Sequence, residues 1–172
     1  MLEALRLARF SLVLRAEEEL WLPPYQGSTL RGGFGSAFRR VACSRAAQRG
    51  PLPDCHGCAL GSVCPYAYVF ETAPTPGSQV LRKYRDVPRP FVLEPPLQPR
   101  GEYKAGERLV LGLVLVGRGI DYLPYFVVAF RELGKQGIGR RGGRSHRGRF
   151  ALEEVRAVEE AGAGEVGTAE AG

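Results

Sequence analysis

The chain has 172 residues, of which 44% are hydrophobic and 24% charged, as in a soluble globular domain rather than a disordered or fibrous chain. No apolar run approaches the ~20 residues of a membrane span, and the N-terminus lacks a small-residue cleavage site, so we expect a cytoplasmic protein. Residues 153–172 hold six of the 18 acids and one of the 24 bases, which leaves residues 1–152 with 23 bases, 12 acids and a net charge of +11. This basic body favours a polyanionic partner.

The first half of the chain is predicted to form a strand, a helix and a long loop. Alternating apolar residues predict a half-buried strand over residues 5–15. Ser28 is expected to cap a helix that ends near Gly50. A cysteine-rich insertion spans about residues 43–65. The apolar face of the helix has helical spacing and consists of Leu30, Phe34, Phe38 and Val41.

The second half is predicted to contain strands and one further helix. The elements are a short strand at 66–71, an edge strand near 89–94, a central strand at 107–117, a helix from Tyr122 to about Leu133 capped by Asp121, and a strand at 149–158. The main order, strand-helix-strand-strand-helix-strand, predicts an α+β, ferredoxin-like βαββαβ fold with a four-stranded antiparallel sheet and both helices on one face. We expect one domain over 1–158 and a flexible acidic tail over 159–172.

The segment "GKQGIGRRGGRSHRGRF" (134–150) combines six glycines with six Lys or Arg residues. Gly137, Gly139 and Gly142 match G-x-G-x-x-G, but they follow a helix and precede a strand, which is the wrong context for a dinucleotide site. Glycine N–H groups and forked guanidinium groups nevertheless suit an RNA backbone. An unliganded basic loop and an RNA-binding disordered segment remain alternatives. The candidate cations are Lys135, Arg140, Arg141, Arg144, Arg147 and Arg149.

All the cysteines of the chain lie within 22 residues, at Cys43, Cys55, Cys58 and Cys64. Their C-x11-C-x2-C-x5-C spacing favours a structural tetrahedral zinc site, because disulfides are rare in the cytoplasm. An iron–sulfur cluster, free thiols and a disulfide are the alternatives. His56 is a cramped substitute for one sulfur ligand.

Metal-independent RNA cleavage requires a base for the 2′-hydroxyl, an acid for the leaving oxygen and a cation for the transition state. His146, in the basic segment, is the candidate base. Tyr25 and Arg31 flank the turn into the first helix and are candidates to orient the hydroxyl and to stabilise the phosphorane. Arg39 and Arg40 continue that helix and are candidate RNA-backbone contacts. A purely structural or solvated role is the alternative for each of these side chains.

Four segments of the chain resemble the CRISPR-associated RAMP superfamily, and in particular its pre-crRNA-processing endoribonuclease branch. They are "LPPYQGSTLRGGFGSAFRRVAC" (22–43), "CPYAYVFE" (64–71), "DVPRPFVLEPP" (86–96) and "IDYLPYFVVAFRELGKQGIGR" (120–140), and the resemblance covers roughly residues 5–158. It implies ferredoxin-like folds, a glycine-rich loop after a late helix, and binding and cleavage of the repeat in a CRISPR transcript.

Two features depart from the pattern of this family. Its nucleases usually carry two ferredoxin-like domains in tandem, whereas this chain has room for one, so we expect the second RAMP domain of the family to be absent from it. Many members also carry a histidine on or near the first helix, where Ser36 stands here. These departures leave open whether the chain alone is an enzyme.

The residues and the resemblance together favour an RNA-binding RAMP domain of a CRISPR pre-crRNA-processing endoribonuclease that supports metal-independent cleavage. Its expected partners are CRISPR repeat RNA or crRNA and other CRISPR-associated proteins, with no membrane. One alternative is a non-catalytic RAMP subunit that binds crRNA in an effector complex. The other is a zinc-stabilised module that binds protein.

Overall fold

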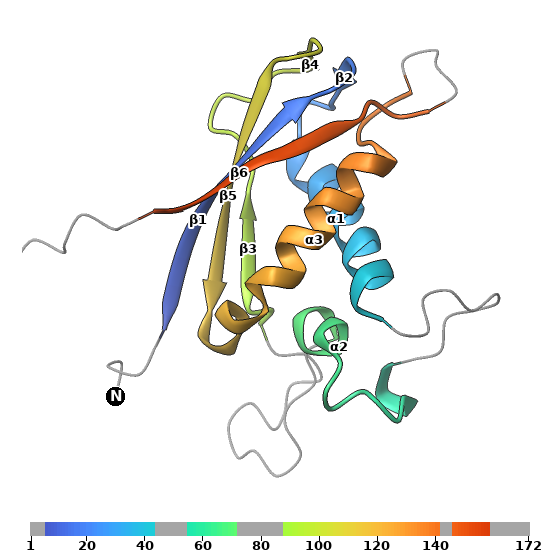
Figure 1. The fold of residues 1–172 in the computed structure, drawn as a ribbon, viewed down its shortest axis with the longest axis vertical. Helices are drawn as coiled ribbons and strands as arrows, with labels where there is room; N and C mark the ends of the chain where they lie inside the picture. The colour runs from blue at the N-terminus through green and yellow to red at the C-terminus, as the bar shows by residue number, and fades with distance from the viewer. Residues whose placement is uncertain (1–5, 44–54, 72–87, 142–145, 159–172) are drawn as a thin grey trace, which may run out of the picture.

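The computed structural model describes residues 6–43, 55–71, 88–141 and 146–158, the side chain of His56 excepted. Its main sheet has four antiparallel strands in the spatial order β3-β5-β1-β6 (Figure 1). With one helix after β1 and one before β6, this order confirms the predicted ferredoxin-like βαββαβ fold. The strands are β1 (Leu7–Ala16), β3 (Phe91–Glu94), β5 (Arg108–Val116) and β6 (Phe150–Val158).

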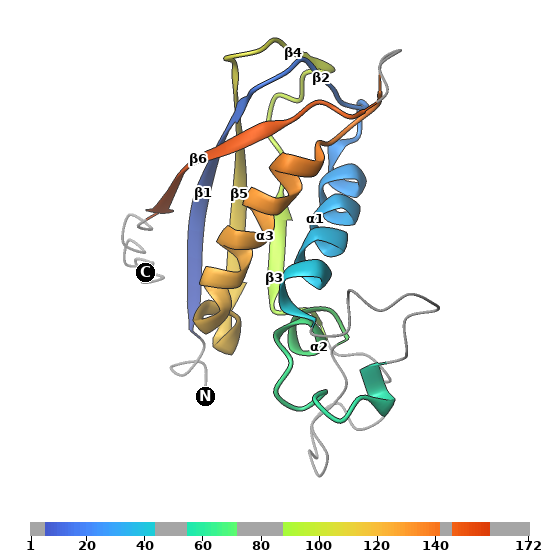
Figure 2. The same cartoon turned by 45° about the vertical axis from the view of Figure 1, so that its right-hand side comes forward.

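Helices α1 (Gln26–Ala42) and α3 (Leu123–Gln136) lie together on one face of this sheet (Figures 1 and 2). A two-stranded sheet, β2 (Leu20–Trp21) with β4 (Glu102–Tyr103), lies at one end of the molecule, next to the segment that follows α3. The short helix α2 (Pro65–Phe70) and the 3-10 turn η1 (Cys55–Gly57) lie at the opposite end. A second 3-10 turn, η2 (Gly117–Tyr122), leads into α3.

The core forms where the alternating leucines of β1 and β5 meet the phenylalanines of the helices. Leu12 and Leu14 of β1 are each 1% exposed, and the odd-numbered leucines of β5 are buried beside them. Phe34 of α1 is fully buried and stacks on Phe130 of α3, with ring centroids 4.7 Å apart. Burial of each such side chain contributes roughly 1.5–3 kcal/mol, so the sheet and helices stabilise one another.

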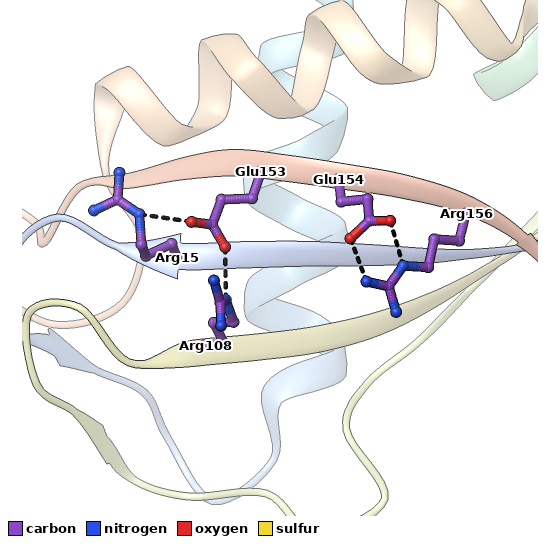
Figure 3. Close-up of polar contacts among 5 residues, drawn as sticks. All are labelled: Arg15, Arg108, Glu153, Glu154 and Arg156. Carbon is purple, nitrogen blue, oxygen red and sulfur yellow. Dashed lines mark hydrogen bonds and ion pairs between the residues drawn. The ribbon is translucent and has the colours of Figure 1, made fainter.

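The other face of the sheet carries charged side chains, and within the described strands it carries no aromatic ring. Glu153 of β6 accepts hydrogen bonds from Arg15 of β1 at 2.9 Å and from Arg108 of β5 at 2.7 Å (Figure 3). Glu154 pairs with Arg156 on the same face. The register of β6 against β1 skips Glu153, which is the extra residue of a β-bulge and so shares a face with Glu154.

Glu94 of the edge strand β3 crosses above β5 to pair with Arg9 of β1 at 2.7 Å. Its path lies over Gly112, where a Cβ would collide with the Glu94 carboxylate. A glycine inside the central strand is therefore the condition for this pair.

Several details differ from the sequence prediction. The strand predicted at 66–71 is wrong: Pro65 begins helix α2, and Tyr66 stacks on Phe70 one turn later at 5.2 Å. This helix buries both Tyr66 and Val69, whereas a strand would place these two side chains on opposite faces. The proline suits the first helical turn, where the missing N–H carries no cost.

Both predicted helix caps are also wrong. Helix α1 begins at Gln26, so Ser28 is its third residue, and no side chain caps it. Its start is fixed instead by the buried Gln26, whose Nε2 donates to the carbonyl of Arg100 at 2.6 Å. Asp121 lies within η2 and pairs with Arg6 at 3.5 Å. Both positions precede a helical apolar pattern, but tertiary contacts decide where each helix starts.

The predicted acidic tail over 159–172 and the first part of the cysteine loop, residues 44–54, lie outside the described residues. Among the residues that the structure does describe, no helix has the length and apolarity needed to cross a bilayer.

Candidate nucleic-acid interface and cysteine pocket

The glycine-arginine segment forms a hairpin stem that packs on β2. Ile138 bridges Gly148 across the hairpin, and Arg140 bridges Trp21 of β2, with the Arg140 N–H donating to the Trp21 carbonyl at 2.8 Å. The Ile138 side chain is 2% exposed and joins the main core. The stem therefore extends the small β2–β4 sheet and is anchored by backbone contacts.

The glycines of the stem have a packing role. Gly137 and Gly139 adopt φ values of +77° and +84°, which other residues rarely do. A Cβ on Gly139 would collide with the Trp21 carbonyl oxygen, and one on Gly148 would collide with the carbonyl oxygen of Glu19. The Gly137 N–H donates to the Leu133 carbonyl at 2.9 Å. The structure thus assigns these glycines to close backbone approach.

Three arginines of the hairpin have side chains available to a ligand. Arg140, Arg141 and Arg147 are exposed, and none of them pairs with an acid in the described parts of the chain. Three unpaired guanidinium groups on one hairpin produce a positive field that favours phosphate. Gly142 and Arg144 fall among residues 142–145, which lie outside the described residues.

Arg149 and His146 contact the same carboxylate. The Arg149 Nη2 atom lies 2.8 Å from Glu18 Oε1, and the Nδ1 atom of His146 lies 3.5 Å from Glu18 Oε2. The hydrogen bond from the Arg149 side chain is the main reason that the pKa of Glu18 is lowered. The charge of Arg149 is therefore already balanced by Glu18. The same carboxylate orients the His146 imidazole at the base of the hairpin, which we call the hairpin root.

The candidates on α1 have different surroundings. Tyr25 is the N-cap residue of α1 and is 72% exposed, and Arg31 lies over the Phe91 ring at 5.3 Å. Tyr25 follows β2 closely in the chain, so it lies at the hairpin end of the molecule. No contact joins His146 to Tyr25 or Arg31 among the described residues.

The remaining cationic candidates already have partners. Arg40 donates to Ser36 Oγ at 3.3 Å and to Gln136 on α3, so it ties the two helices together. Arg39 lies over the Tyr66 ring at 5.1 Å. Lys135 is exposed, with its Nζ 4.0 Å from Glu132 one turn earlier. Arg39 and Arg40 thus act in helix packing. Lys135 is exposed in the last turn of α3, just before the hairpin.

All of the predicted metal ligands line one pocket of about 160 Å³, at the end of the molecule opposite the hairpin. All four thiols are free and partly buried. Burial raises the pKa of the Cys55 thiol above its usual value. No group of three or more His, Cys, Asp or Glu side chains within the described ranges converges on a single point as a preformed metal site.

Sequence reasoning missed Glu18 and Trp21, which hold the root of the hairpin. Glu18 lies in an acidic run, "EEE" (17–19), next to a predicted strand. In an otherwise basic chain, this run was the available signal that an acid could pair with the basic segment. Trp21 is 38% exposed and contributes its backbone to the bridge with Arg140. A two-residue strand has no periodicity, so its pairing leaves no pattern in the sequence.

The fold is similar to that of a solved complex. In a crystal structure of the Csm3-Csm4 subcomplex of the type III-A CRISPR-Cas interference complex, a chain aligns with a TM-score of 0.54 and 13% sequence identity. The alignment covers 88% of this chain and 77% of that chain. At this identity the likeness concerns the fold alone, and it agrees with the ferredoxin-like topology.

A relative with detectable sequence similarity is an uncharacterized protein of Archaeoglobus fulgidus, which is 33% identical over 117 residues. The match covers 68% of this chain, but the chain spans only 37% of the length of that relative. The family described as "AF_1859_N: N-terminal domain" matches residues 5–171. This match extends over nearly all of the 172 residues, and the chain therefore belongs to that family.

Proposed function

We propose that this chain is an RNA-binding RAMP domain of a CRISPR system, and that it holds CRISPR repeat RNA or crRNA through the hairpin after α3. The observation that carries the proposal is the set of exposed guanidinium groups of Arg140, Arg141 and Arg147, which pair with no acid among the described residues, on a stem anchored to β2. A fixed stem limits the entropy lost when these side chains order on a phosphate backbone. The RAMP-like fold shared with the Csm3-Csm4 subcomplex is consistent with this role.

The open face of the sheet is a weaker candidate for contact with RNA bases. RNA-binding sheets of the RRM type stack bases on aromatic rings, and the described strands present no ring on this face. Its arginines at positions 15, 108 and 156 are paired with Glu153 and Glu154. The RNA is therefore expected to follow the hairpin end.

The test is the dependence of RNA affinity on salt, measured with a CRISPR repeat RNA and a scrambled RNA of equal length. About five phosphate contacts to a single strand give a log–log slope of about −3.5. Salt-independent affinity would overturn the proposal and favour a protein-binding module. Equal affinity for the two RNAs would support phosphate binding and overturn recognition of the repeat.

A second candidate function is cleavage of the repeat without metal, and His146 favours it. Glu18 and the Arg147 carbonyl lie at 3.5 and 3.1 Å from its Nδ1, which leaves Nε2 without a partner in the described part of the molecule. An imidazole oriented in this way resembles a general base held by a carboxylate. Tyr25, exposed at the same end, is the accompanying candidate to contact the 2′-hydroxyl.

Single-turnover incubation of the protein with repeat RNA in excess EDTA tests cleavage. If the chain cuts, His146→Ala should lower the rate by roughly 10²–10⁴-fold, with RNA affinity nearly unchanged. Tyr25→Phe is the matched variant for the hydroxyl contact. Tight binding without any cut would exclude this activity and leave the non-catalytic, crRNA-holding role.

A further inference from the structure

The cysteine end of the molecule has no part in the RNA contacts proposed above, yet it gathers every cysteine of the chain around one pocket. Two of these residues mark helix ends: Cys43 is the C-cap residue of α1, and Cys64 is the N-cap residue of α2. The other two, Cys55 and Cys58, lie at the start of η1 and directly after it. The fold thus brings thiols from three separate elements to one place.

The backbone of the central pair makes two successive tight turns. The Cys58 N–H donates to the Cys55 carbonyl at 3.1 Å, and the Gly61 N–H donates to the Cys58 carbonyl at 2.9 Å. A Cβ at Gly61 would lie 3.0 and 3.1 Å from these two carbonyl oxygens, so glycine allows this compact turn. Such turns let both thiols of a C-x2-C pair face the same side.

Among the residues that the structure describes, the rest of the pocket lining is apolar and offers no competing oxygen ligand from a side chain. It consists of Ala42, Leu60, Gly61, Val63, Pro65 and Ala67. Without carboxylates, the pocket disfavours hard cations such as Mg²⁺ and Ca²⁺. Four thiols in an apolar lining select a thiophilic metal.

The charges around the pocket suit a thiolate-bound metal. Four thiolates and one divalent ion carry a net charge of about −2. Arg39 approaches from α1, lies over Tyr66, and has a buried Nε without a hydrogen-bond partner in the described residues. A thiolate sulfur would provide that acceptor.

We propose that Cys43, Cys55, Cys58 and Cys64 bind one Zn²⁺ as a structural site that fastens η1 and α2 to the end of α1. The sulfurs would lie ~2.3 Å from the ion, so binding requires the four side chains to turn inward from their positions in the pocket. With every ligand position occupied by sulfur, the ion has no open position for catalysis. The site is thus separate from the RNA-binding hairpin in both place and chemistry.

The test uses the whole chain, purified without added metal. Elemental analysis should find about one zinc per chain. Titration of the metal-free protein with Co²⁺ should produce sulfur-to-cobalt charge-transfer bands and the intense d–d bands of a tetrahedral tetrathiolate. Thiol alkylation of the native protein should be slow until the metal is removed.

Cys58→Ser tests the ligand set, and Leu60→Ala, which lines the same pocket, is its matched control. Cys58→Ser should weaken metal affinity at least ~10-fold and should weaken the cobalt charge-transfer band, whereas Leu60→Ala should retain both. Zinc-free protein with four rapidly alkylated thiols would overturn the proposal. So would a disulfide found by mass spectrometry, or iron with inorganic sulfide. The measurements on the unmodified protein do not depend on RNA binding or on the folding of any variant.

Discussion

The two ends of this molecule are held by different kinds of contact. At one end, the hairpin stem after α3 is fixed to β2 through backbone atoms, and its glycines allow these two segments of the backbone to approach closely. At the other end, where α2 lies (Figures 1 and 2), side chains hold the helix, with Phe70 packed among Phe38, Phe91 and Tyr66. A glycine-rich sequence can therefore indicate close backbone contact as much as a ligand. Clustered aromatic rings indicate side-chain packing, and the clustered thiols are the basis of the zinc site proposed above.

The largest expected effect is on the free energy of unfolding, from a change at the α2 end of the molecule. Phe70→Ala removes a ring whose centroid lies 5.2 to 5.4 Å from three other rings. It should lower the free energy of unfolding by about 3 kcal/mol, measured by urea denaturation. Val63→Ala, at a side chain 70% exposed, is the control and should change it by less than ~0.5 kcal/mol. Equal effects of the two variants would contradict side-chain anchoring.

The next largest effect on the free energy of unfolding is expected at the hairpin end of the molecule. Gly139→Ala places a Cβ against the Trp21 carbonyl at a positive φ, so it should cost about 2 kcal/mol of unfolding free energy. Gly32→Ala is the matched control, because nothing lies within 4 Å of a Cβ there and Gly32 lies within α1. That change should stabilise the protein by roughly 0.5–1 kcal/mol. Two substitutions of the same type with opposite signs would establish the backbone contact. A neutral Gly139→Ala would refute it.

A third prediction separates charge from fold at the hairpin. Replacing its three unpaired arginines by alanine should reduce the log–log salt slope of RNA binding by about 2 and leave thermal stability nearly unchanged. A control with the same loss of charge uses exposed arginines away from the hairpin. A slope that falls equally in both would show that RNA binding follows total charge alone. The hairpin set is Arg140, Arg141 and Arg147, and the control set is Arg6, Arg118 and Arg131.

The smallest effect concerns the acid sensitivity of the hairpin root. Because the pKa of Glu18 is lowered in the folded protein, chiefly by its hydrogen bond with Arg149, this pair stabilises the fold above the usual glutamate pKa. That stability is lost as pH falls from the usual glutamate pKa through the lowered value. Glu18→Gln should flatten the acid limb of a plot of melting temperature against pH. An unchanged limb would show that the pair has no effect on stability.

The sheet and the two main helices could be predicted because they follow simple periodicities. Alternating residues mark β1, and the run of leucines and valines marks the central strand β5. The helical spacing of Leu30, Phe34 and Phe38 places all three in the core. These patterns record which side of an element is buried, and that is the information from which a fold class can be inferred.

The helix caps, α2 and the hairpin anchor could not be predicted in the same way. The start of α1 depends on a bond from Gln26 to a carbonyl 74 positions away in the chain. Residues 66–71 contain aromatic and β-branched side chains that suit a strand. They form a helix because the Phe70 ring packs against Phe34 and Phe91, which are distant in the sequence. For the candidate site, the basic segment and the cysteines could be identified from residue types. Which cations were free and which were paired depended on distant acids such as Glu18.

Because of the bulge in β6, one extra residue determines how many carboxylates lie on the open face of the sheet. The extra residue places Glu153 beside Glu154, and these two with Glu94 offset most of the charge of Arg9, Arg15, Arg108 and Arg156. Deleting residue 153 would restore strict alternation and remove the acid shared by Arg15 and Arg108. A one-residue deletion would thus leave those four arginines opposed by two carboxylates in place of three, and the open face would become more attractive to a polyanion.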